Sequence, residues 1–457
     1  MNGLIIFLII FIIIIILALI GVAIWYYYDK KKKEPTPGGG DTGGNNNNDG
    51  NGGNEGGFTG PNVVSFLLDS RSYNANDILQ FNSIQGTNTS PMGSISGGIW
   101  TAGVTGTYLI FADATNKGGG GSISILKGNT ILGTQLSLDT FGQTSLVTMG
   151  FANLVPGDKL EVKTLNQISI IDPDPKINAT SHFIIERILP QSSVLYLTDG
   201  GSIPSNSIVP FNRTQEGTDS IGSISNGTWT PTMSGTYLIF ADATNNGGGG
   251  SLDIISGNNT IGTGFKTVIG TAGQSNNTTV TTMGVANLNI GDSISVRTPS
   301  GMVITTPNPS TELTCHFLIQ KVDTSKIVSY IFSSTQPMIA ANSVLQFSQL
   351  QGVSTDPLGT MNNGTWTCTS PGKYLFFADA TNDGGGGELV IMAANITIGT
   401  GYFPSSTVPG NETILTMGYA QLNPGDNVVV VTKLEISITN PDPSTSATSH
   451  LIIYKIN

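Results

Sequence analysis

The chain has 457 residues, of which 11% are charged, 59 are glycine and 2 are cysteine, and its formal net charge at pH 7 is -11. Phosphate contacts need clustered lysine and arginine, and the one such cluster is Lys30 to Lys33, so the composition argues against a nucleic-acid-binding protein. Two cysteines are too few for a disulfide-built scaffold, and the length allows about three domains with cores of their own.

The N-terminal segment predicts a membrane anchor. Residues 4–28 carry no formal charge and are dominated by isoleucine and leucine, and at about 1.5 Å per residue a helix of this length exceeds a hydrocarbon core of about 30 Å. Trp25 and the three following tyrosines stand where an aromatic belt belongs, directly before the lysines. Residues 1–34 are therefore expected to form a transmembrane helix with a basic flank. A cleaved signal peptide is the competing interpretation, but it would need a basic start and a shorter apolar core.

The lysines also predict an orientation. Because no basic residue precedes the apolar segment and four follow it, the positive-inside rule places the rest of the chain on the cytosolic side, or facing a viral capsid. The alternative is that the lysines only stop transfer and the bulk is luminal or extracellular. Asn-X-Ser/Thr sites separate the two, because they become glycans only in the second case. These sites are Asn88, Asn178, Asn212, Asn226, Asn258, Asn276, Asn277, Asn363, Asn395 and Asn411.

Residues 35–60 predict a flexible linker. They run from proline into glycine and asparagine without periodic apolar residues, a composition typical of disordered tethers. Such a tether has a root-mean-square reach of roughly 25 to 30 Å, so the globular part can stand clear of the bilayer.

One stretch then occurs three times. It reads GTYLIFADATNKGGGG from Gly106, GTYLIFADATNNGGGG from Gly235 and GKYLFFADATNDGGGG from Gly372. A tryptophan precedes each copy, and a Gly-Asp turn and a histidine follow each in the same order. The copies lie too far apart for a solenoid repeat, so each period is a domain. The predicted domains are residues 61–189, 190–323 and 324–457.

Within each repeat the apolar residues come in short runs broken by glycine, proline, asparagine and aspartate. Examples are VVSFLL from Val63, KLEVKTL from Lys159 and SHFIIERI from Ser181. No stretch after Tyr28 sustains helical periodicity, so the fold class is expected to be all-β, with each repeat a sandwich or jelly roll. The next repeat begins about five residues after Ile188, at Ser193, so no long linker separates the domains.

Three strings in the last repeat carry a family resemblance: GTWTCTSPGKYLFFADA from Gly364, LNPGDNVVVV from Leu422 and SHLIIYKI from Ser449. Their order resembles that of the globular head of complement component C-one-q and its tumour-necrosis-factor-like relatives. The resemblance implies three tandem jelly rolls, whose first and last strands are neighbours and whose inner sheets pack around a three-fold axis. The chain departs from that family because no collagen-like triplets precede the heads and three heads share one chain.

An aspartate and a histidine recur in every repeat. They are Asp113, Asp242 and Asp379 in the repeated stretch, and His182, His316 and His450 in the last strand. In the family resembled, these two strands are neighbours on the axis-facing sheet, so the resemblance implies buried polar pairs at a trimer axis, with a metal on the axis as the alternative. Catalysis is not expected, because the residue before each histidine (Ser181, Cys315 or Ser449) points to the opposite face of its strand.

Three further features are expected to be structural. The acidic loops with Asp172, Asp174 and Asp442 offer oxygens that suit calcium, but the middle repeat has no carboxylate there, which favours turn chemistry. The runs of four glycines lack the lysine and helix of a phosphate loop, so they are expected to be strand-connecting turns. Finally, Trp100, Trp229 and Trp366 are expected to anchor the cores, not to form a carbohydrate-stacking surface. No cofactor is expected.

The sequence as a whole favours a membrane-anchored, non-enzymatic structural or attachment protein, spike-like in form. Its low charge and its orientation would suit a virion membrane protein of a large DNA virus. A ligand-binding or lectin-like receptor or adhesin, with a protein or glycan partner, is the alternative. For assembly, an intrachain pseudo-trimer of the three heads is expected, and a homotrimer is the rival.

Overall fold

The computed structural model describes residues 63–68, 71–85, 92–137, 142–170, 181–189, 191–217, 220–266, 277–304, 315–332, 338–384, 386–403, 410–438 and 449–456. Within these ranges the chain is built from β-strands and one short 3-10 helix, η1 (Thr324–Lys326). The all-β prediction is confirmed. No helix in the same ranges has the length and hydropathy needed to cross a membrane. The predicted span at residues 4–28 and the linker at 35–60 lie outside the described residues.

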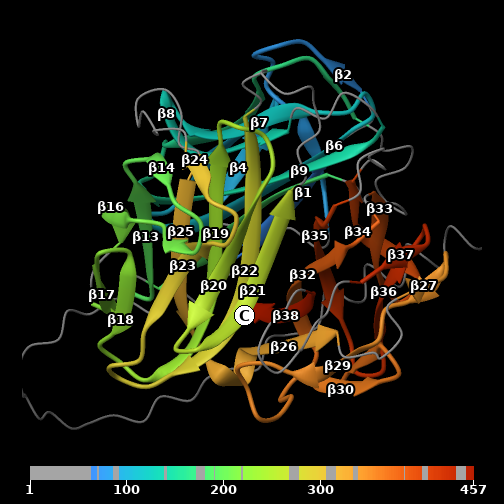
Figure 1. Ribbon diagram of the computed structural model, residues 1–457. Coiled ribbons are helices and arrows are strands. Elements are labelled where there is room, and N and C mark those ends of the chain that lie inside the picture. Colours follow the sequence, from blue (N-terminus) through green and yellow to red (C-terminus); the bar gives the residue numbers. More distant parts are fainter. Residues whose placement is uncertain are drawn as a thin grey trace, which may run out of the picture. The chain divides into compact units, whose positions relative to one another are not determined.

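The first repeat forms two facing sheets, drawn in blue to green in Figure 1. One sheet has the order β3 (Phe81–Ile84), β1 (Val63–Leu68), β12 (His182–Ile188), β6 (Gly106–Asn116), β9 (Thr144–Leu154). The other has the order β4 (Gly93–Ser96), β5 (Ile99–Ala102), β10 (Lys159–Thr164), β7 (Gly121–Lys127), β8 (Thr130–Ser137). A small ribbon pairs β2 (Ser72–Tyr73) with β11 (Ile168–Ser169).

The second repeat uses the same strand order. Its first sheet contains β16 (Phe211–Gly217), β13 (Ser193–Thr198), β25 (Cys315–Val322), β19 (Gly235–Asn245) and β22 (Thr278–Leu288), with β24 (Met302–Ile304) and β14 (Gly201–Ile203) continuing from β19. Its second sheet contains β17 (Gly222–Ser225), β18 (Thr228–Pro231), β23 (Ile294–Thr298), β20 (Gly250–Ser256) and β21 (Asn259–Lys266), with β15 (Ser207–Ile208) on β23.

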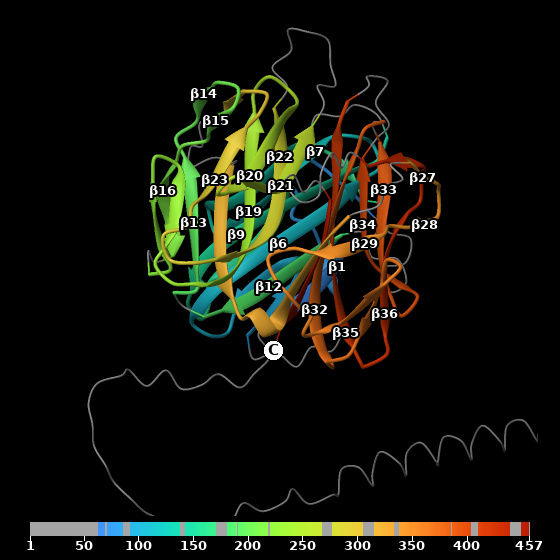
Figure 2. The same ribbon diagram turned by 60° about the horizontal axis from the view of Figure 1, so that its bottom comes forward.

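The third repeat, orange to red in Figures 1 and 2, repeats the arrangement. Its first sheet contains β29 (Phe347–Leu350), β26 (Ile327–Phe332), β38 (His450–Ile456), β32 (Gly372–Asn382) and β35 (Glu412–Leu422). Its second sheet contains β30 (Gly359–Asn362), β31 (Thr365–Cys368), β36 (Asn427–Thr432), β33 (Gly387–Ala393) and β34 (Ile396–Phe403), with β28 (Ser343–Val344) on β36 and a separate ribbon of β27 (Met338–Ile339) and β37 (Ile436–Ser437).

In every repeat the first long strand pairs antiparallel with the last, so β1 lies beside β12, β13 beside β25 and β26 beside β38. This adjacency, which the family resemblance implied, is confirmed. It brings the two ends of each repeat together. The next repeat therefore starts close by: β13 begins at Ser193 after β12 ends at Ile188, and β26 begins at Ile327 after β25 ends at Val322.

Each sandwich buries its own hydrophobic core between its two sheets. In the second and third repeats these cores include Trp229 and Trp366, and all three tryptophans, Trp100 among them, are 0% exposed. Each packs edge-on against the tyrosine near the start of the following long strand, with ring centroids 5.2 to 5.7 Å apart. Such complete burial leaves no aromatic face for a sugar to stack on, and supports the prediction of core anchors.

The glycine runs form tight turns around an asparagine side chain. In the first repeat, Asn116 Nδ2 donates to the carbonyls of Gly119 and Gly120, while Gly118 N donates to Asn116 Oδ1. Gly119, Gly120 and Gly121 all have positive φ, which side chains disfavour. Asn245 and Asn382 hold the equivalent turns. This geometry is that of strand-connecting turns.

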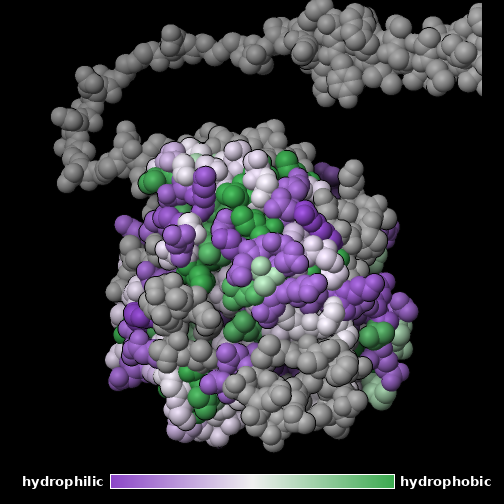
Figure 3. Space-filling model, turned by 90° about the horizontal axis from the view of Figure 1, so that it is seen from above, coloured by the Kyte–Doolittle hydropathy of each residue, from purple (hydrophilic) through white to green (hydrophobic). Residues whose placement is uncertain are grey.

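Among the described residues, ten large hydrophobic side chains are exposed. Figure 3 shows one face, on which hydrophobic side chains lie between hydrophilic ones. The most exposed of these hydrophobic side chains are Leu189 at 74% and Ile290 at 68%, both in loops next to strand ends. Single apolar residues of this kind are ordinary on soluble surfaces.

Candidate functional site

A hydrophobic cluster lies apart from the sandwich cores and takes residues from all three repeats. Its centre is formed by Phe111 of β6, Phe240 of β19 and Phe377 of β32, which hold equivalent places in the repeated stretch. The three ring centroids are 5.1, 5.1 and 5.5 Å apart, so each ring contacts both others. The cluster also contains Met149, Met283 and Met417, again at equivalent positions. We call this cluster the seam.

A set of three equivalent hydrogen bonds runs around the seam. Leu136 N donates to Thr279 Oγ1 at 3.1 Å, Phe265 N to Thr413 Oγ1 at 2.9 Å and Tyr402 N to Ser145 Oγ at 2.9 Å. The first repeat thus donates to the second, the second to the third and the third to the first. The set is closed, as a three-fold arrangement requires.

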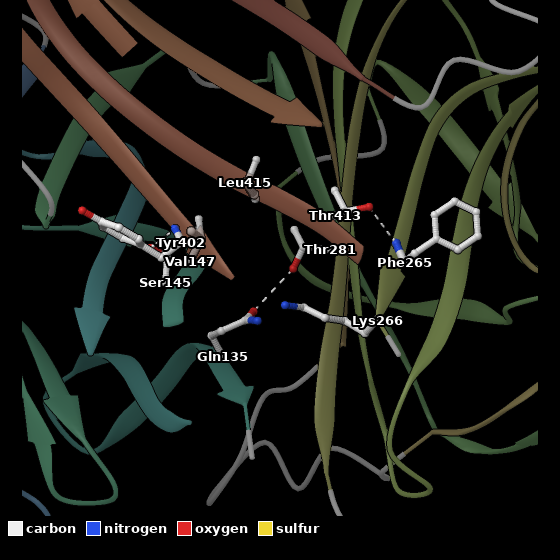
Figure 4. Close-up of a pocket in the computed structure, with 9 residues that line it drawn as sticks. All are labelled: Gln135, Ser145, Val147, Phe265, Lys266, Thr281, Tyr402, Thr413 and Leu415. Carbon is white, nitrogen blue, oxygen red and sulfur yellow. Dashed lines mark hydrogen bonds between the residues drawn. The ribbon is translucent and has the colours of Figure 1, made fainter. Parts of the chain in front are cut away.

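The seam has a small hollow at this level, shown in Figure 4 with side chains from all three repeats. The space that the centre of a water molecule can occupy is about 20 Å³, which suits about one water. Three equivalent positions there hold unlike residues: Val147, Thr281 and Leu415. Thr281 Oγ1 donates to Gln135 Oε1 at 3.4 Å. The hollow is too small for an organic ligand.

The predicted aspartate and histidine pairs are brought together in every repeat. His182 Nδ1 lies 2.8 Å from Asp113 Oδ1, and the pairs His316–Asp242 and His450–Asp379 have the same separation. Every member is at most 1% exposed. Burial raises the pKa of Asp113 above its ordinary value, and the charge and hydrogen bonds of His182 oppose that rise.

One of these pairs reaches across to a neighbouring repeat. His450 Nε2 lies 3.0 Å from the carbonyl oxygen of Ile261 in β21. A carbonyl only accepts, so Nε2 must carry a proton and donate it. The other ring nitrogen faces Asp379, so the imidazole ties a buried carboxyl group of the third repeat to the backbone of the second. This is a structural role at the contact between repeats.

The residue that precedes each histidine is not placed to act as its nucleophile. Ser181 Oγ, Cys315 Sγ and Ser449 Oγ each accept a hydrogen bond from a backbone N–H of the neighbouring strand, and Cys315 belongs to the core inside the second sandwich. Adjacent residues of a strand face opposite sides, so the histidines face away from these groups. The geometry therefore assembles no hydrolytic triad from them.

A second polar group in the seam was missed by the sequence analysis. Glu186 of β12, Gln320 of β25 and Tyr454 of β38 are equivalent residues, four positions after each histidine. Glu186 and Gln320 are both 3% exposed. Burial raises the pKa of Glu186 to about 8, against a hydrogen bond from Tyr454 and the charge of Lys326. The signal was available, since a carboxylate inside the apolar run HFIIERI needs an explanation.

The remaining candidate sites are the acidic loops, a possible metal site and the glycosylation sites. The acidic loops with Asp172, Asp174 and Asp442 lie outside the described residues, and so do Asn88, Asn178 and Asn276. Within the described ranges no group of three or more histidine, cysteine, aspartate or glutamate residues could hold a metal ion. Five of the glycosylation sites are exposed on strands or turns: Asn212, Asn226, Asn258, Asn363 and Asn395. Asn277 and Asn411 are half-buried.

A larger hollow lies between the first and third repeats. The space that the centre of a water molecule can occupy there is about 490 Å³. The hollow lies between the edge strand β3 and strands β34 and β35, and its walls include Ile84, Ile396, Ile398 and Tyr419. Ile84 and Ile396 are each 47% exposed. Its walls are more apolar than those of a sugar-binding site, which needs several convergent polar groups.

Comparison with known proteins identifies no family for the chain. No family model matches the chain, and no curated protein matches it. Among solved structures, the crystal structure of murine APRIL at pH 5.0, a jelly roll of the tumour-necrosis-factor family, is similar to part of the chain. It is 15% identical, covers 28% of this chain and 98% of that chain, and has a TM-score of 0.23.

Proposed function

We propose that this chain is a membrane-anchored, non-enzymatic structural or attachment protein whose three jelly-roll heads close into a pseudo-trimer within one chain. The sequence strings that begin at Gly364, Leu422 and Ser449 resemble the globular head of complement component C-one-q and its tumour-necrosis-factor-like relatives. A virion membrane of a large DNA virus is the setting that the anchor and its lysines favour. The anchor rests on the sequence of residues 4–28 alone.

One observation carries the proposal. Glu186, Gln320 and Tyr454 occupy equivalent positions between apolar residues of the seam, yet they are chemically unlike and complementary. In a homotrimer, a symmetric axis would bring three copies of the same residue together. Three buried carboxyl groups of Glu186 would then repel one another or all be protonated. A single chain that surrounds its own axis avoids this conflict, because each position can differ.

The assembly is tested by measuring the mass of the full-length protein in mild detergent. Light scattering gives this mass once the contribution of the bound detergent is subtracted. A protein mass of 47.7 kDa supports closure within one chain. A mass three times larger would show that the heads seek partners on other chains, and would overturn the proposal.

The orientation is tested separately. Expression with microsomes, followed by endoglycosidase treatment, should leave the mass of the chain unchanged if residues 35–457 face the cytosol or its viral equivalent. Exposed sites such as Asn226 and Asn363 are accessible to the glycosylation machinery if the domain is luminal. A loss of mass would reverse the orientation while leaving the assembly untouched.

A ligand-binding head is the second candidate, and the hollow beside β3 and β34 is the observation that favours it. An apolar ligand there would contact the first and third repeats together and so stabilise the closed form. Thermal unfolding with apolar fluorescent probes would reveal it. Ile396→Glu should abolish any such shift, since a charge would then stand in the wall of the hollow.

A further inference from the structure

The second polar group of the seam consists of three side chains on one face of three equivalent strands. In β12, Glu186 stands between Ile184 and Ile188, and both isoleucines belong to the seam. Alternate residues of a strand point to the same side, so Glu186 also faces the seam. Gln320 stands between Leu318 and Val322 in the same way, and Tyr454 between Ile452 and Ile456. Three repeats therefore each contribute one polar side chain to one level of an apolar seam.

Tyr454 forms side-chain hydrogen bonds with Glu186 and Gln320 at this level, but these leave two acceptors unmatched. Glu186 Oε2 and Gln320 Oε1 are buried acceptors without a partner among the described residues. Ser193 Oγ, from the strand that pairs with Gln320, is buried there without a partner as well, and its hydroxyl can donate to only one acceptor. Leaving a buried acceptor without a donor costs about 1 to 3 kcal/mol, and leaving a carboxylate charged there costs more.

The groups that face Glu186 do not supply a full counter-charge. Tyr454 donates a hydrogen bond to it, and Lys326 of η1 acts on it only through its charge. Asp323, at the start of η1, adds a negative charge near Tyr454. The next basic residue on the same strand, Arg187, is directed elsewhere, with its guanidinium donating to the carbonyl of Thr105. Glu186 is thus a buried acid with one neutral donor and one partly exposed cation.

We propose that Glu186 is a proton-binding site of the closed protein: its carboxyl group is protonated where it is buried in the seam, and loss of that proton to solvent loosens this end of the seam. The ligand of the site is the proton itself. The inference rests on the single-chain assembly proposed above. Failure of that assembly would appear as a trimeric mass, independently of any measurement on Glu186.

The direction of the pH effect follows from the two protonation states. In the unfolded chain the pKa of Glu186 takes its ordinary value of 4.5, and in the folded protein burial raises it to about 8. Between these values the folded state holds one proton more than the unfolded state, so stability falls as pH rises. The contribution is complete below 4.5 and is lost as pH approaches 8. Within this window, the ratio of folded to unfolded protein should fall about tenfold per pH unit.

The test compares the full-length protein with Glu186→Gln in urea unfolding across this window. Glutamine keeps the shape and offers an amide donor but cannot ionise, so the variant should lack the tenfold fall per unit that the unaltered protein shows. Glu435→Gln, at an exposed carboxylate, is the matched control and should keep the fall. Parallel pH profiles of the unaltered protein and Glu186→Gln would overturn the proposal.

Two further measurements keep the test decisive if Glu186→Gln folds poorly. Infrared spectra of the unaltered protein at neutral pH should contain a protonated-carboxyl band that vanishes as pH passes about 8. Tyr454→Phe removes the hydrogen bond that lowers the pKa of Glu186, so the band should persist to higher pH in that variant. Absence of the band in the unaltered protein, or an unmoved transition in Tyr454→Phe, would contradict the proposal.

Discussion

The three sandwich cores and the seam are built from the same repeated sequence, but they differ in how far the three copies have diverged. In each sandwich a buried tryptophan packs on a tyrosine at nearly the same distance. In the seam, a leucine, a phenylalanine and a methionine are identical in all three repeats. Other equivalent positions hold unlike residues, among them Glu186, Gln320 and Tyr454. Every sandwich must bury its own core. The chain forms the seam only once, so the residues that the three repeats contribute to it can differ.

The largest effect of a substitution is expected at the centre of the seam. Phe240→Ala should lower the free energy of unfolding by roughly 3 to 5 kcal/mol, because the ring contacts Phe111 and Phe377 and its removal leaves a cavity. Urea unfolding measures the loss. Hydrogen exchange should quicken in β6, β19 and β32 together. Exchange that quickens in the second repeat alone would mean that the three repeats do not share this core.

A truncation of similar size inside one sandwich should behave differently. Trp229→Ala should also cost roughly 3 to 5 kcal/mol, since the side chain is 0% exposed. The faster exchange should be confined to the second repeat, in β17, β18 and β23. Ile290→Ala, at a 68% exposed position, is the control and should change little. Unchanged stability with loss of sugar binding would make Trp229 a ligand platform instead.

The hydrogen bonds around the seam should have smaller effects. Thr279→Val removes the acceptor of Leu136 N and the partner of Thr244 Oγ1, and should cost about 1 to 3 kcal/mol because a buried donor loses its partner. Thr281→Val, two residues along the same strand, removes only a 3.4 Å bond to Gln135 and should cost less. Equal losses in the two variants would contradict a specific role for Thr279.

The smallest effect is expected for a single tyrosine hydrogen bond of the second sandwich. Tyr237→Phe removes the hydroxyl group that donates to the carbonyl of Met233. The cost should be about 0.5 to 1.5 kcal/mol, because Met233 is 45% exposed and water can replace the lost donor. Spectroscopic titration checks the same contact, since burial raises the pKa of Tyr237 to about 12. A titration at the ordinary value of 10.0 would place the ring in solvent.

Much of the fold could be predicted from the sequence, because strands and turns leave local signals. The run VVSFLL predicted β1, and the glycine runs predicted strand-connecting turns, several of whose glycines have positive φ in the structure. The pairing of β1 with β12 could not be read from local patterns, since its partners lie more than a hundred residues apart; it came from the family resemblance. Strand boundaries depend on which backbone groups find partners, and a single sequence does not contain that information.

The candidate site was predicted in part. Repetition identified the aspartates and histidines, because the same residue type returned at the same place in each copy. It overlooked Glu186, Gln320 and Tyr454 for the same reason, since these three differ. A comparison of the repeats detects positions at which every copy has the same residue. It does not detect equivalent positions that hold different, complementary residues, because these are recognised only once the contacts between side chains are known.

The short connections between the repeats have a consequence for how the assembly responds to dilution. Separate subunits come apart as their concentration falls, because association competes with translational freedom. Here β13 starts at Ser193 after β12 ends at Ile188, and β26 starts at Ile327 after β25 ends at Val322, so each head meets the next at an effective concentration on the order of millimolar, whatever the amount of protein present. A surface carrying only a few copies of such a molecule would keep every one of them assembled.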